Sequence, residues 1–482
     1  MDLQTLSSPV EYVKQFMHPH DPDSLANYEA WWHSEGNVIS SAVDRAGTPW
    51  LRMFDEFGRR VDEIFFASDY WRMLRKGYES GLLWKTFEQN SLVPAFEILY
   101  ITSFYDPGLA CPYTVSLSTA APVSKYGSPE LQEKLFSPML RRDGINWQGA
   151  TWMTEIKGGS DLGASVETVA RPAEERWLLT GDKYFASNVG AELAVVAARI
   201  DGSPQGVRGL SLFLVPRYRR NGELNYFIRR LKDKVATRSV PTGEVELRDS
   251  EAYLLGHPNR GIYLILEVLN ISRIANSIGS VALAQRAISD ALTFAQRRIA
   301  FGKPIIEHPL LCRQFTERVA DLRRASALAW ESVRLLNDVW QERAPYSDRY
   351  HLFRLVAHLA KYWTAEFAVQ TSKWAMEVHG AIGVMQEFGI ERWLREAMIL
   401  AIWEGTSHRQ ILDGLEVMER KRAHESLFQH IAPFADRAQM EQMRQRVEEL
   451  LDLDIDERQS AAENVFRDLA QFTGETLTDR PR

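Results

Sequence analysis

Cysteine is scarce in this chain: Cys111 and Cys312 are the two cysteines among 482 residues. Two cysteines cannot build the disulfide framework of a small secreted scaffold or the ligand set of a cysteine-rich zinc module. Low cysteine use is typical of a reducing compartment. A chain of this length can bury enough apolar surface to be stable without such cross-links. We therefore expect a globular protein stabilised by its hydrophobic cores.

Long apolar runs are also missing. No stretch reaches the ~18 uninterrupted apolar residues typical of a membrane-spanning helix. The first residues, Met1 to Thr5, show no basic segment followed by an apolar one, as a secretory signal would. These absences predict a cytoplasmic protein with no membrane partner.

Positive charge is not in excess. The 57 Lys and Arg residues face 64 Asp and Glu residues, which gives a formal net charge of -7. This balance argues against a chain-wide binder of polyanions, while a local basic patch stays compatible with it. Residues 419–482 carry 10 basic and 14 acidic side chains, a net charge of -4. Nucleic acid is therefore a less favoured partner than a small molecule.

Several common motifs are absent. The chain has no G-x-G-x-x-G after a strand, no G-x-x-x-x-G-K-[ST] and no H-E-x-x-H. The stretch from Gly158 to Gly163 is not a nucleophile elbow, because its second glycine falls one residue too late. The run from Asp452 to Asp456 resembles the start of a calcium loop, but Glu457 occupies the position that requires glycine. We expect no Rossmann dinucleotide fold, no P-loop and no metal.

Helical patterns mark the beginning and the end of the chain. Ser128 is a candidate N-cap, followed by Pro129 at the first helical position and Glu130 in the first turn. Further along, apolar residues recur every three or four positions, as an amphipathic helix requires. They are Val281, Ala284, Ile288, Ala291 and Ala295.

Short strand-like runs separate these two helical blocks. Trp177–Thr180 and Lys183–Ala186 flank Gly181-Asp182, which predicts a hairpin, and further runs cover 193–198 and 210–215. We predict an α+β fold with a helical N-terminal domain and a small central β-barrel or sandwich. A helical C-terminal bundle and a helical tail extension follow. The predicted limits are 1–148, 149–258, 259–418 and 419–482.

Two clusters near the strand block could bind a ligand. Thr154–Asp161 is rich in small and hydroxyl residues, which let backbone amides approach a phosphate or a planar ring. The alternative is an ordinary polar turn. Arg298 begins a second cluster, Arg298–Pro304, and an arginine there could neutralise a pyrophosphate. The alternative is a helix C-terminus, with the arginine opposing the helix dipole and Gly302 ending the helix.

Two more clusters lie in the last third of the bundle. Glu377–Gly383 is a glycine-bearing break at the end of a helix, where His379 has an ordinary structural role. In Trp403–Gln410, Ser407 and Gln410 fit a capping box that opens the next helix. Glu404 precedes that helix in an apolar setting, where a raised pKa would make it a proton-abstracting base. A surface glutamate is the alternative.

Taken in order, these clusters resemble the signatures of the acyl-CoA dehydrogenase flavoprotein family. Thr154–Asp161 is similar to the family's Thr-Glu-Pro-x-Ala-Gly-Ser-Asp, and Lys183–Asn188 to its Lys-x-Trp-Ile-[Thr/Ser]-Asn strand. Arg298–Lys303 matches Arg-x-x-Phe-Gly-Lys, and Trp403–His408 resembles Tyr-Glu-Gly-Thr-Ser-Gln. Pro309 after His308, and the segment 110–114, resemble the divergent AidB-like branch.

This resemblance implies FAD as the cofactor. Met153, Thr154 and Ser160 would line the flavin and its phosphates, and Phe185 and Ser187 would pack on its ring. Residues implied to reach the cofactor of a neighbouring subunit are Arg298, Phe301, Glu377, Gly380 and Ala381. Thr406 and His408 would contact the phosphates or the adenine side. Cofactor sites shared in this way imply a homodimer or homotetramer.

The implied reaction is the α,β-dehydrogenation of an acyl thioester such as acyl-CoA, as in fatty acid metabolism. Glu404 would remove the α-proton while a hydride leaves the β-carbon for flavin N5, and an electron-transfer flavoprotein would accept the electrons. Some members carry the base near the start of the third block, where this chain has Ser272. Arg273 and Gly405 are implied substrate contacts, although Arg273 could simply form a helix salt bridge. Two alternatives stay open: an AidB-like DNA-binding flavoprotein, and an oxidase or monooxygenase of the same fold.

Overall fold

The computed structural model describes residues 3–478 and 480. Within it the chain folds into two units, each with its own core. The helical unit comprises Met1–Ala30, Leu92–Tyr105 and Arg273–Arg482. The barrel unit comprises Trp31–Ser91 and Asp106–Ser272. Both units are therefore assembled from separate stretches of sequence.

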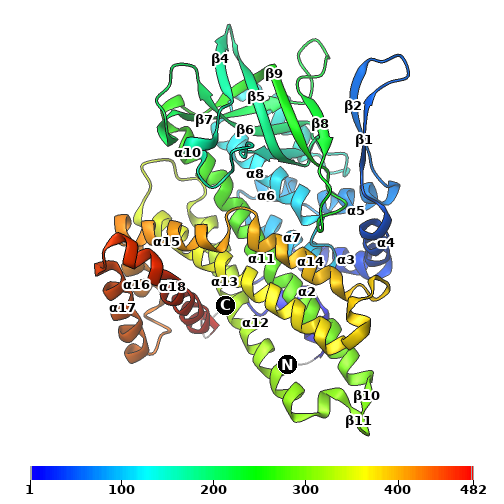
Figure 1. Cartoon of the computed structure of the whole chain (residues 1–482), viewed down its shortest axis with the longest axis vertical. Coiled ribbons are helices and arrows are strands. Elements are labelled where there is room, and N and C mark those ends of the chain that lie inside the picture. The colour runs from blue at the N-terminus through cyan, green and yellow to red at the C-terminus, as the bar shows by residue number, and fades with distance from the viewer. Residues whose placement is uncertain (1–2, 479, 481–482) are drawn as a thin grey trace. The chain divides into compact units, whose positions relative to one another are not determined.

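The barrel unit combines helices with a closed sheet (Figure 1). Its helices are α4 Asn37–Ala46, α5 Ser68–Glu79, α6 Trp84–Glu88, α8 Ala110–Tyr126, α9 Pro129–Leu131 and α10 Leu162–Ser165. The strands of its main sheet are β3 Gly149–Trp152, β4 Val169–Ala173, β5 Arg176–Ser187, β6 Leu193–Ile200, β7 Leu210–Pro216, β8 Phe227–Leu231 and β9 Thr242–Leu255. As expected, the Ser128 hydroxyl caps α9 by accepting from the Leu131 amide at 3.3 Å.

The main sheet closes into a barrel. Its strand order is β3-β6-β4-β5-β9-β7, and β8 pairs with β9. The additional pairing of β7 with β6 closes a ring of β6, β4, β5, β9 and β7. Closure removes exposed sheet edges and leaves an interior that side chains must fill. Trp152, Phe213, Tyr226 and Leu247 belong to this core, and the rings of Trp152 and Tyr226 meet edge to face at 4.8 Å. The predicted small β-barrel is thus confirmed.

The expected hairpin at Gly181-Asp182 is wrong. β5 runs without a turn from Arg176 to Ser187 and pairs along its length with β9, with a register shift between Leu179 and Gly181. Gly181 adopts a φ of +152°, and a Cβ there would lie 2.6 Å from the Thr168 hydroxyl oxygen. Glycine is needed for this close approach and for the bulge, so a strand irregularity resembled a turn.

A hairpin in the N-terminal block was not expected from the sequence. β1 Trp50–Phe54 and β2 Arg60–Phe65 pair antiparallel inside the block predicted to be helical. Trp50 and Phe65 stack at 4.3 Å between ring centroids. The aromatic cross-strand pair stabilises the hairpin in a segment where polar residues mask the alternation of strands.

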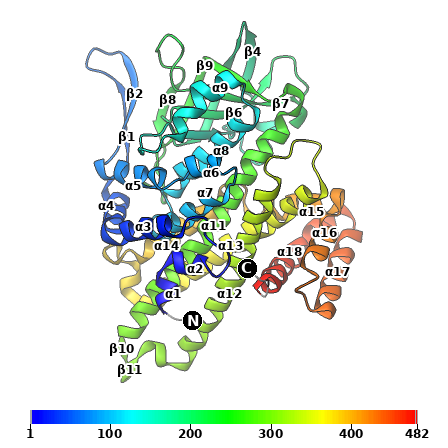
Figure 2. The ribbon, with the colours of Figure 1, turned by 180° about the vertical axis from the view of Figure 1, so that it is seen from behind.

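The helical unit contains long helices and a helical tail (Figure 2). Its helices are α1 Leu3–Ser7, α2 Pro9–Val13, α3 Pro22–Trp31, α7 Val93–Tyr105, α12 Pro309–Val339, α13 Asp348–His379, α14 Ile390–Ile402, α15 Ser407–Lys421, α16 Ala423–Ile431, α17 Arg437–Asp452 and α18 Ile455–Thr478. α18 packs against α12, α13 and α15. Gly414 permits this approach, because a Cβ there would lie 2.4 Å from the Phe466 ring. The tail extension is therefore a packed part of the helical unit.

The helix α11 Gly261–Arg297 begins in the barrel unit and continues from Arg273 onward in the helical unit. Its predicted apolar face, from Val281 to Ala295, is fully buried. Among the described residues, α11 is long and apolar enough to cross a membrane by length and composition. However, 83% of its most apolar window is buried inside the protein, as in the core helix of a globular domain.

After α11 the chain forms a tight hairpin. β10 Ile299–Ala300 pairs with β11 Lys303–Pro304, and the two turn residues Phe301 and Gly302 have φ angles of +52° and +82°. Two positive φ angles are typical of a type I′ hairpin turn. The alternative in which Gly302 ends the helix is therefore wrong. The predicted order of helical, β and helical domains is confirmed, whereas the predicted domain limits stay predictions.

Candidate active site

Glu404 lies in a strained link between two helices of the helical unit. α14 ends at Ile402 and α15 begins at Ser407. Within the link, Glu404 has a φ of +58° and Gly405 a φ of +100°. Glycine adopts the left-handed region readily, but a glutamate there is under backbone strain that its surroundings must offset. Strain of this kind is concentrated at functional sites.

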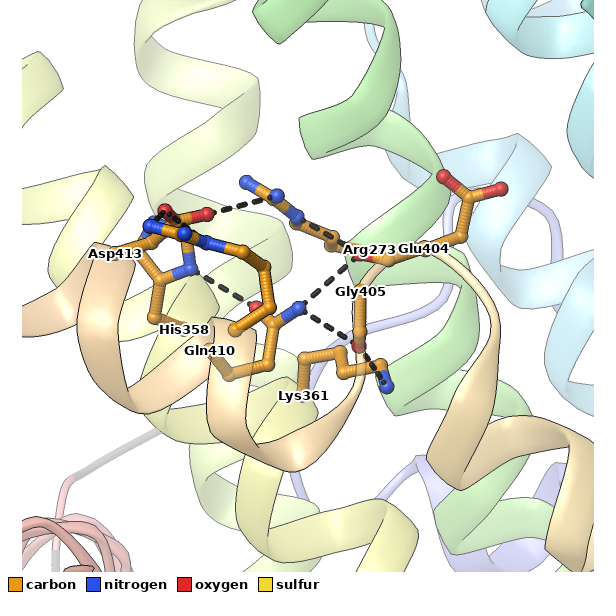
Figure 3. A network of polar contacts seen from close by, with 8 residues as sticks. Arg273, His358, Lys361, Glu404, Gly405, Gln410 and Asp413 are labelled. Carbon is orange, nitrogen blue, oxygen red and sulfur yellow. Dashed lines mark hydrogen bonds and ion pairs between the residues drawn. The ribbon is translucent and has the colours of Figure 1, made fainter. Parts of the chain in front are cut away.

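Buried donors hold the two carbonyls of this link (Figure 3). Arg273 Nε and Gln410 Nε2 donate to the carbonyl oxygen of Glu404, at 3.2 and 3.1 Å. Gln410 Nε2 also donates to the Gly405 carbonyl at 3.0 Å, and Lys361 Nζ donates to the same oxygen at 2.7 Å. We call these three donors, Arg273, Lys361 and Gln410, the carbonyl clamp. The clamp fixes the unusual backbone conformation of the link.

His358 fixes the orientation of the Gln410 side chain. Gln410 Oε1 lies 2.9 Å from His358 Nδ1. Because the amide nitrogen of Gln410 is used on the two carbonyls, its oxygen must accept, so the proton of His358 sits on Nδ1. Burial and the neighbouring Arg273 lower the pKa of His358 to about 3. The imidazole is therefore neutral near pH 7 and acts as a fixed donor.

A carboxylate anchors Arg273 on its other side. Arg273 Nη2 lies 3.1 Å from Asp413 Oδ2, and Arg409 Nε donates to Asp413 Oδ1 at 2.7 Å. Burial acts to raise the pKa of Asp413, but the adjacent positive charge outweighs it and the pKa is lowered. Since His358 is neutral, Arg273 and Arg409 supply that charge. Asp413 stays ionised and holds the Arg273 guanidinium against the link.

The side chain of Glu404 points away from its own clamp (Figure 3). Among residues 3–478 and 480, no hydrogen bond or ion pair engages its carboxyl group. The residue is half-buried, and the protein surrounds the carboxyl closely enough that burial raises its pKa to about 7. Arg273 and Lys361 act in the opposite direction. An unpaired carboxyl with a pKa near neutrality can take up and release a proton under ordinary conditions.

The expected capping box at the start of α15 is wrong. Thr406 occupies the N-cap position with extended backbone angles, and Ser407 is the first residue of the helix. Ser407 Oγ donates to Glu366 Oε1 at 2.5 Å, and Gln410 binds the link carbonyls in place of a helix amide. His408 is exposed on the first turn. The sequence pattern was correct for the helix start but one residue out of register.

A second group of predicted site residues lies elsewhere in the helical unit. Arg298, Phe301, Glu377, Gly380 and Ala381 are all exposed, and Phe301 is 96% exposed. Arg273 lies about 36 Å along α11 from the start of this group, at about 1.5 Å per residue. Figure 1 shows the β10–β11 hairpin far from α15. Within this unit the structure therefore separates these residues from Glu404.

The predicted flavin contacts of the barrel unit gather around one turn. The Tyr184 amide donates to the Thr154 carbonyl at 3.0 Å, which places the start of the turn beside Phe185. Trp152 Nε1 donates to the Ser187 carbonyl at 3.2 Å. The other predicted contacts differ in exposure: Met153 is buried, Thr154 and Ser187 are half-buried, Ser160 is exposed and the Phe185 ring is 52% exposed.

A buried ion pair supports this turn, and sequence reasoning missed it. Lys183 Nζ donates to Glu155 Oε1 at 2.6 Å, and Glu155 also accepts from the Thr168 hydroxyl at 2.6 Å. Burial lowers the pKa of Lys183, whereas the positive charge of Lys183 outweighs burial and lowers that of Glu155. The sequence did contain a signal, because both partners are charged residues at buried positions. Glu155 lies in the cluster Thr154–Asp161, and Lys183 lies in the strand β5.

Two further residues near the Glu404 link, His358 and Lys361, were not predicted from the sequence. His358 and Lys361 lie in an otherwise apolar stretch of α13, and both are 1% exposed. Polar residues on a buried helix face need partners, so they mark a polar site inside the bundle. This signal was present in the sequence, but it does not say which loop the side chains would contact.

Comparison with known proteins assigns the chain to a family. Residues 259–418 match the acyl-CoA dehydrogenase C-terminal domain, and residues 150–250 match the middle domain of the same family. Residues 7–143 match the N-terminal domain of the adaptive response protein AidB. The chain belongs to the acyl-CoA dehydrogenase family. The resemblance inferred from the four motifs, including its AidB-like branch, is confirmed.

Curated relatives are moderately similar. Acyl-CoA dehydrogenase family member 11 of Caenorhabditis elegans is 31% identical over 80% of this chain and 66% of its own length. The chain thus spans just under two thirds of that relative. Putative acyl-CoA dehydrogenase AidB of Escherichia coli is 29% identical over 83% of this chain and 75% of its own. The human mitochondrial short-chain specific acyl-CoA dehydrogenase is 33% identical over 60% of this chain and 67% of its own.

Solved structures share the fold. Bd2924 in its apo form has a TM-score of 0.90 and 27% identity, over 99% of this chain and 97% of its own. Caenorhabditis elegans ACDH-11, in complex with C11-CoA, has a TM-score of 0.88 over 98% of this chain and 86% of its own. Its identity of 24% supports the fold alone.

Proposed function

We propose that this chain is an FAD-dependent enzyme that oxidises an acyl thioester such as acyl-CoA between its α- and β-carbons. Glu404 is the base in this proposal. The observation that carries it is the Glu404 carboxyl, which has a pKa of about 7 and no partner among the described residues. A carboxyl of this kind, on a backbone link fixed by three donors, is poised for proton abstraction. Family membership supports the same chemistry.

The chemistry requires a base because the α-hydrogen of a thioester is only weakly acidic. Glu404 removes this α-proton and becomes a carboxylic acid. When bound, FAD supplies the acceptor for the hydride that leaves the β-carbon. The product is then an α,β-unsaturated thioester, and the two hydrogens are accounted for. Arg273 keeps Glu404 in place through its carbonyl and lowers the pKa of the carboxyl.

The residues of the barrel unit fit a flavin chemically. The exposed Phe185 ring offers a flat apolar surface, and the hydroxyls of Thr154 and Ser187 offer hydrogen bonds nearby. Gly159 keeps the turn compact, because a Cβ there would lie 2.4 Å from the Thr154 hydroxyl oxygen. In the proposal Met153 and Ser160 complete this surface. A family member from Bacillus anthracis was solved in complex with FAD, which supports the assignment.

The exposed group at the other end of the helical unit has a separate role in the proposal. Arg298 directly precedes the β10–β11 hairpin, and Phe301 lies in its turn. Glu377 is in the last turn of α13, and Gly380 and Ala381 follow that helix. In the proposal this group, which begins about 36 Å along α11 from Arg273, serves a second subunit. We propose a homodimer or homotetramer in which this group reaches the partner's cofactor. Thr406 and His408 are proposed contacts of the cofactor's phosphate or adenine side.

Acyl-CoA and an electron-transferring flavoprotein are the proposed partners. ACDH-11 was solved with C11-CoA, and a structure of the same fold was solved in work on the electron transferring flavoprotein of Acidaminococcus fermentans. Arg273 and Gly405 are the proposed substrate contacts beside Glu404. A reducing, cytoplasmic location is part of the proposal, since the exposed Cys312 is a free thiol.

Anaerobic reduction of the bound flavin by a panel of acyl-CoAs tests the proposal. We expect the absorbance of oxidised flavin to be lost with at least one chain length or branching pattern. Absence of a flavin after reconstitution, or no bleaching with any acyl-CoA, would overturn it. Peroxide release in air would instead identify an oxidase. A salt-sensitive shift of DNA together with no bleaching would favour the AidB-like alternative.

A further inference from the structure

Lys361 is a buried lysine that the proposed reaction does not use. It lies in α13 and is 1% exposed. Its Nζ donates to the Gly405 carbonyl at 2.7 Å and to the Ala401 carbonyl at 3.4 Å. No ion pair with a carboxylate is found for it within residues 3–478 and 480. Its direct partners are neutral carbonyl oxygens at the end of α14 and in the link.

This arrangement is costly and therefore calls for a reason. An ammonium group removed from water loses several kcal/mol of hydration energy unless charges or hydrogen bonds replace the water. Lys183, another buried lysine that donates to a carbonyl, also has a carboxylate, Glu155, at 2.6 Å. Two carbonyls satisfy only part of the requirement of Lys361. A leucine or methionine at this position would fill the space at lower cost.

The position of Lys361 relative to Glu404 supplies a reason. Figure 3 shows Lys361 on the opposite side of the link from the Glu404 carboxyl, with its amine at the Gly405 carbonyl. The contact is one residue beyond Glu404 and fixes Gly405, the second residue of the link with a positive φ. A positive charge there also favours a negative charge on Glu404. Arg273 acts similarly on Glu404, but it is also paired with Asp413, whereas Lys361 has no ion pair among the described residues.

We propose that Lys361 is a positioning residue for Glu404, which holds the link through the Gly405 carbonyl and sets the proton affinity of the base through its charge. This inference rests on the proposed role of Glu404 as the base. It concerns a residue on α13 that makes no contact with the carboxyl itself.

Two titrating groups then act as a pair. Burial lowers the pKa of Lys361 to about 7, and Arg273 adds to this, while the carboxyl groups of Glu404 and Glu366 raise it. Glu404 itself has a pKa of about 7. Groups that interact and titrate in the same range lose their protons in coupled steps. Removal of the Lys361 charge leaves the Glu404 carboxylate less stabilised, so the pKa of Glu404 should rise.

Infrared spectroscopy of the carboxyl group provides a test that does not depend on turnover. The FAD-loaded protein is titrated, and the Glu404 signal is assigned by its loss in Glu404→Gln. In Lys361→Met we expect the Glu404 titration to move to higher pH by about one unit, the lower end of the range for a nearby opposite charge. Lys421→Met is the matched control, because this exposed lysine ends α15. It should leave the titration unchanged.

A second variant separates charge from hydrogen bonding. Lys361→Gln keeps a donor for the Gly405 carbonyl but carries no charge, so it should shift the Glu404 titration as Lys361→Met does. It should also lose less of the flavin reduction rate than Lys361→Met. If Lys361→Met does not fold, Lys361→Gln serves for the titration. An unchanged titration of Glu404 in a folded variant would overturn the proposal.

The outcome also distinguishes this inference from the proposed function. If no acyl-CoA reduces the wild-type flavin, the proposed function fails while the infrared titration still reports on Lys361. If the wild type is reduced and Lys361→Met shows the same pH profile and rate, the function stands and the role of Lys361 is wrong. A fall in kcat with little change in KM supports positioning, because substrate contacts would remain intact.

Discussion

Gln410 Nε2 donates to the main-chain carbonyl of Glu404 at 3.1 Å, while Oε1 of the same side chain lies 2.9 Å from His358 Nδ1. One amide thus connects a neutral histidine in α13 to the backbone of the proposed base. Gln410 is fully buried, so water cannot replace either bond easily. The conformation of Glu404 depends on a residue six positions further along the chain.

Gln410→Met should therefore slow flavin reduction without removing the base. Methionine fills a similar volume but offers no donor, so the Glu404 and Gly405 carbonyls lose one partner each. A displacement of the base by about 1 Å can cost roughly 100-fold in rate. We expect a decrease of 10- to 100-fold in the rate of anaerobic bleaching. Gln445→Met, on the exposed face of α17, is the control and should react normally. Normal rates in both variants would show that the clamp is dispensable.

Glu404→Gln should abolish flavin reduction by acyl-CoA and leave FAD bound. Glutamine keeps the size of the side chain and can adopt the same backbone angles, but it cannot accept the α-proton. The matched control is Glu416→Gln on α15, whose side chain is 46% exposed and pairs with Arg420. Stopped-flow absorbance after mixing with substrate measures both. Reduction of Glu404→Gln at the wild-type rate would identify a different base.

The pH dependence of rate and stability should both report on Glu404. In the proposed function the carboxylate form is the base, so the bleaching rate should rise as pH passes through about 7. The folded pKa lies above the ordinary value of 4.5, so the fold favours the protonated form. This contribution to stability is complete below pH 4.5 and is lost as pH rises through 7.

Glu404→Gln has no such proton to lose. The free energy of unfolding of Glu404→Gln should therefore increase relative to that of the wild type between pH 5 and pH 8, by on the order of 2 kcal/mol. Urea unfolding at several pH values measures the difference. Parallel pH curves for the two proteins would contradict a raised pKa at Glu404.

Glu331 should be important for the stability of the helical tail. This buried carboxylate of α12 accepts from His430 Nε2 at 2.6 Å and from Arg334 Nε at 2.8 Å, and it also pairs with Arg480. Burial acts to raise its pKa, but these three groups outweigh burial and lower the pKa to about 2. The interaction therefore stabilises the fold above pH 4.5, and this contribution is lost as pH falls toward 2.

Glu331→Gln should destabilise the protein by roughly 3–5 kcal/mol at pH 7, as expected when one member of a buried ion cluster is removed. The loss should shrink below pH 4.5. Glu441→Gln, on the exposed surface of α17, should change stability by less than about 0.5 kcal/mol. Urea unfolding followed by circular dichroism distinguishes the two. An equally small effect for Glu331 would mean that the cluster adds nothing to stability.

Much of the architecture and the family could be inferred from the sequence by itself. Periodic apolar residues such as Val281 and Ala284, and a cap such as Ser128, act over a few residues, so local patterns reveal them. Glu404 could be nominated because its apolar neighbours are adjacent in the chain. Four short motifs in order then identified the family, although Gly181 and Gly302 were assigned to the wrong kinds of turn.

Only the tertiary structure decided how Glu404 is held. Arg273, His358, Lys361 and Gln410 come from three helices, and no local pattern indicates that their side chains converge on one strained link. Such contacts depend on how helices pack, which is set by the whole bundle. The pKa of Glu404 is a property of that packing, since it is determined by burial and by two cations far away in the sequence, Arg273 and Lys361. The sequence nominated Glu404 as the proposed base, and the fold determined the conformation and the proton affinity of this residue.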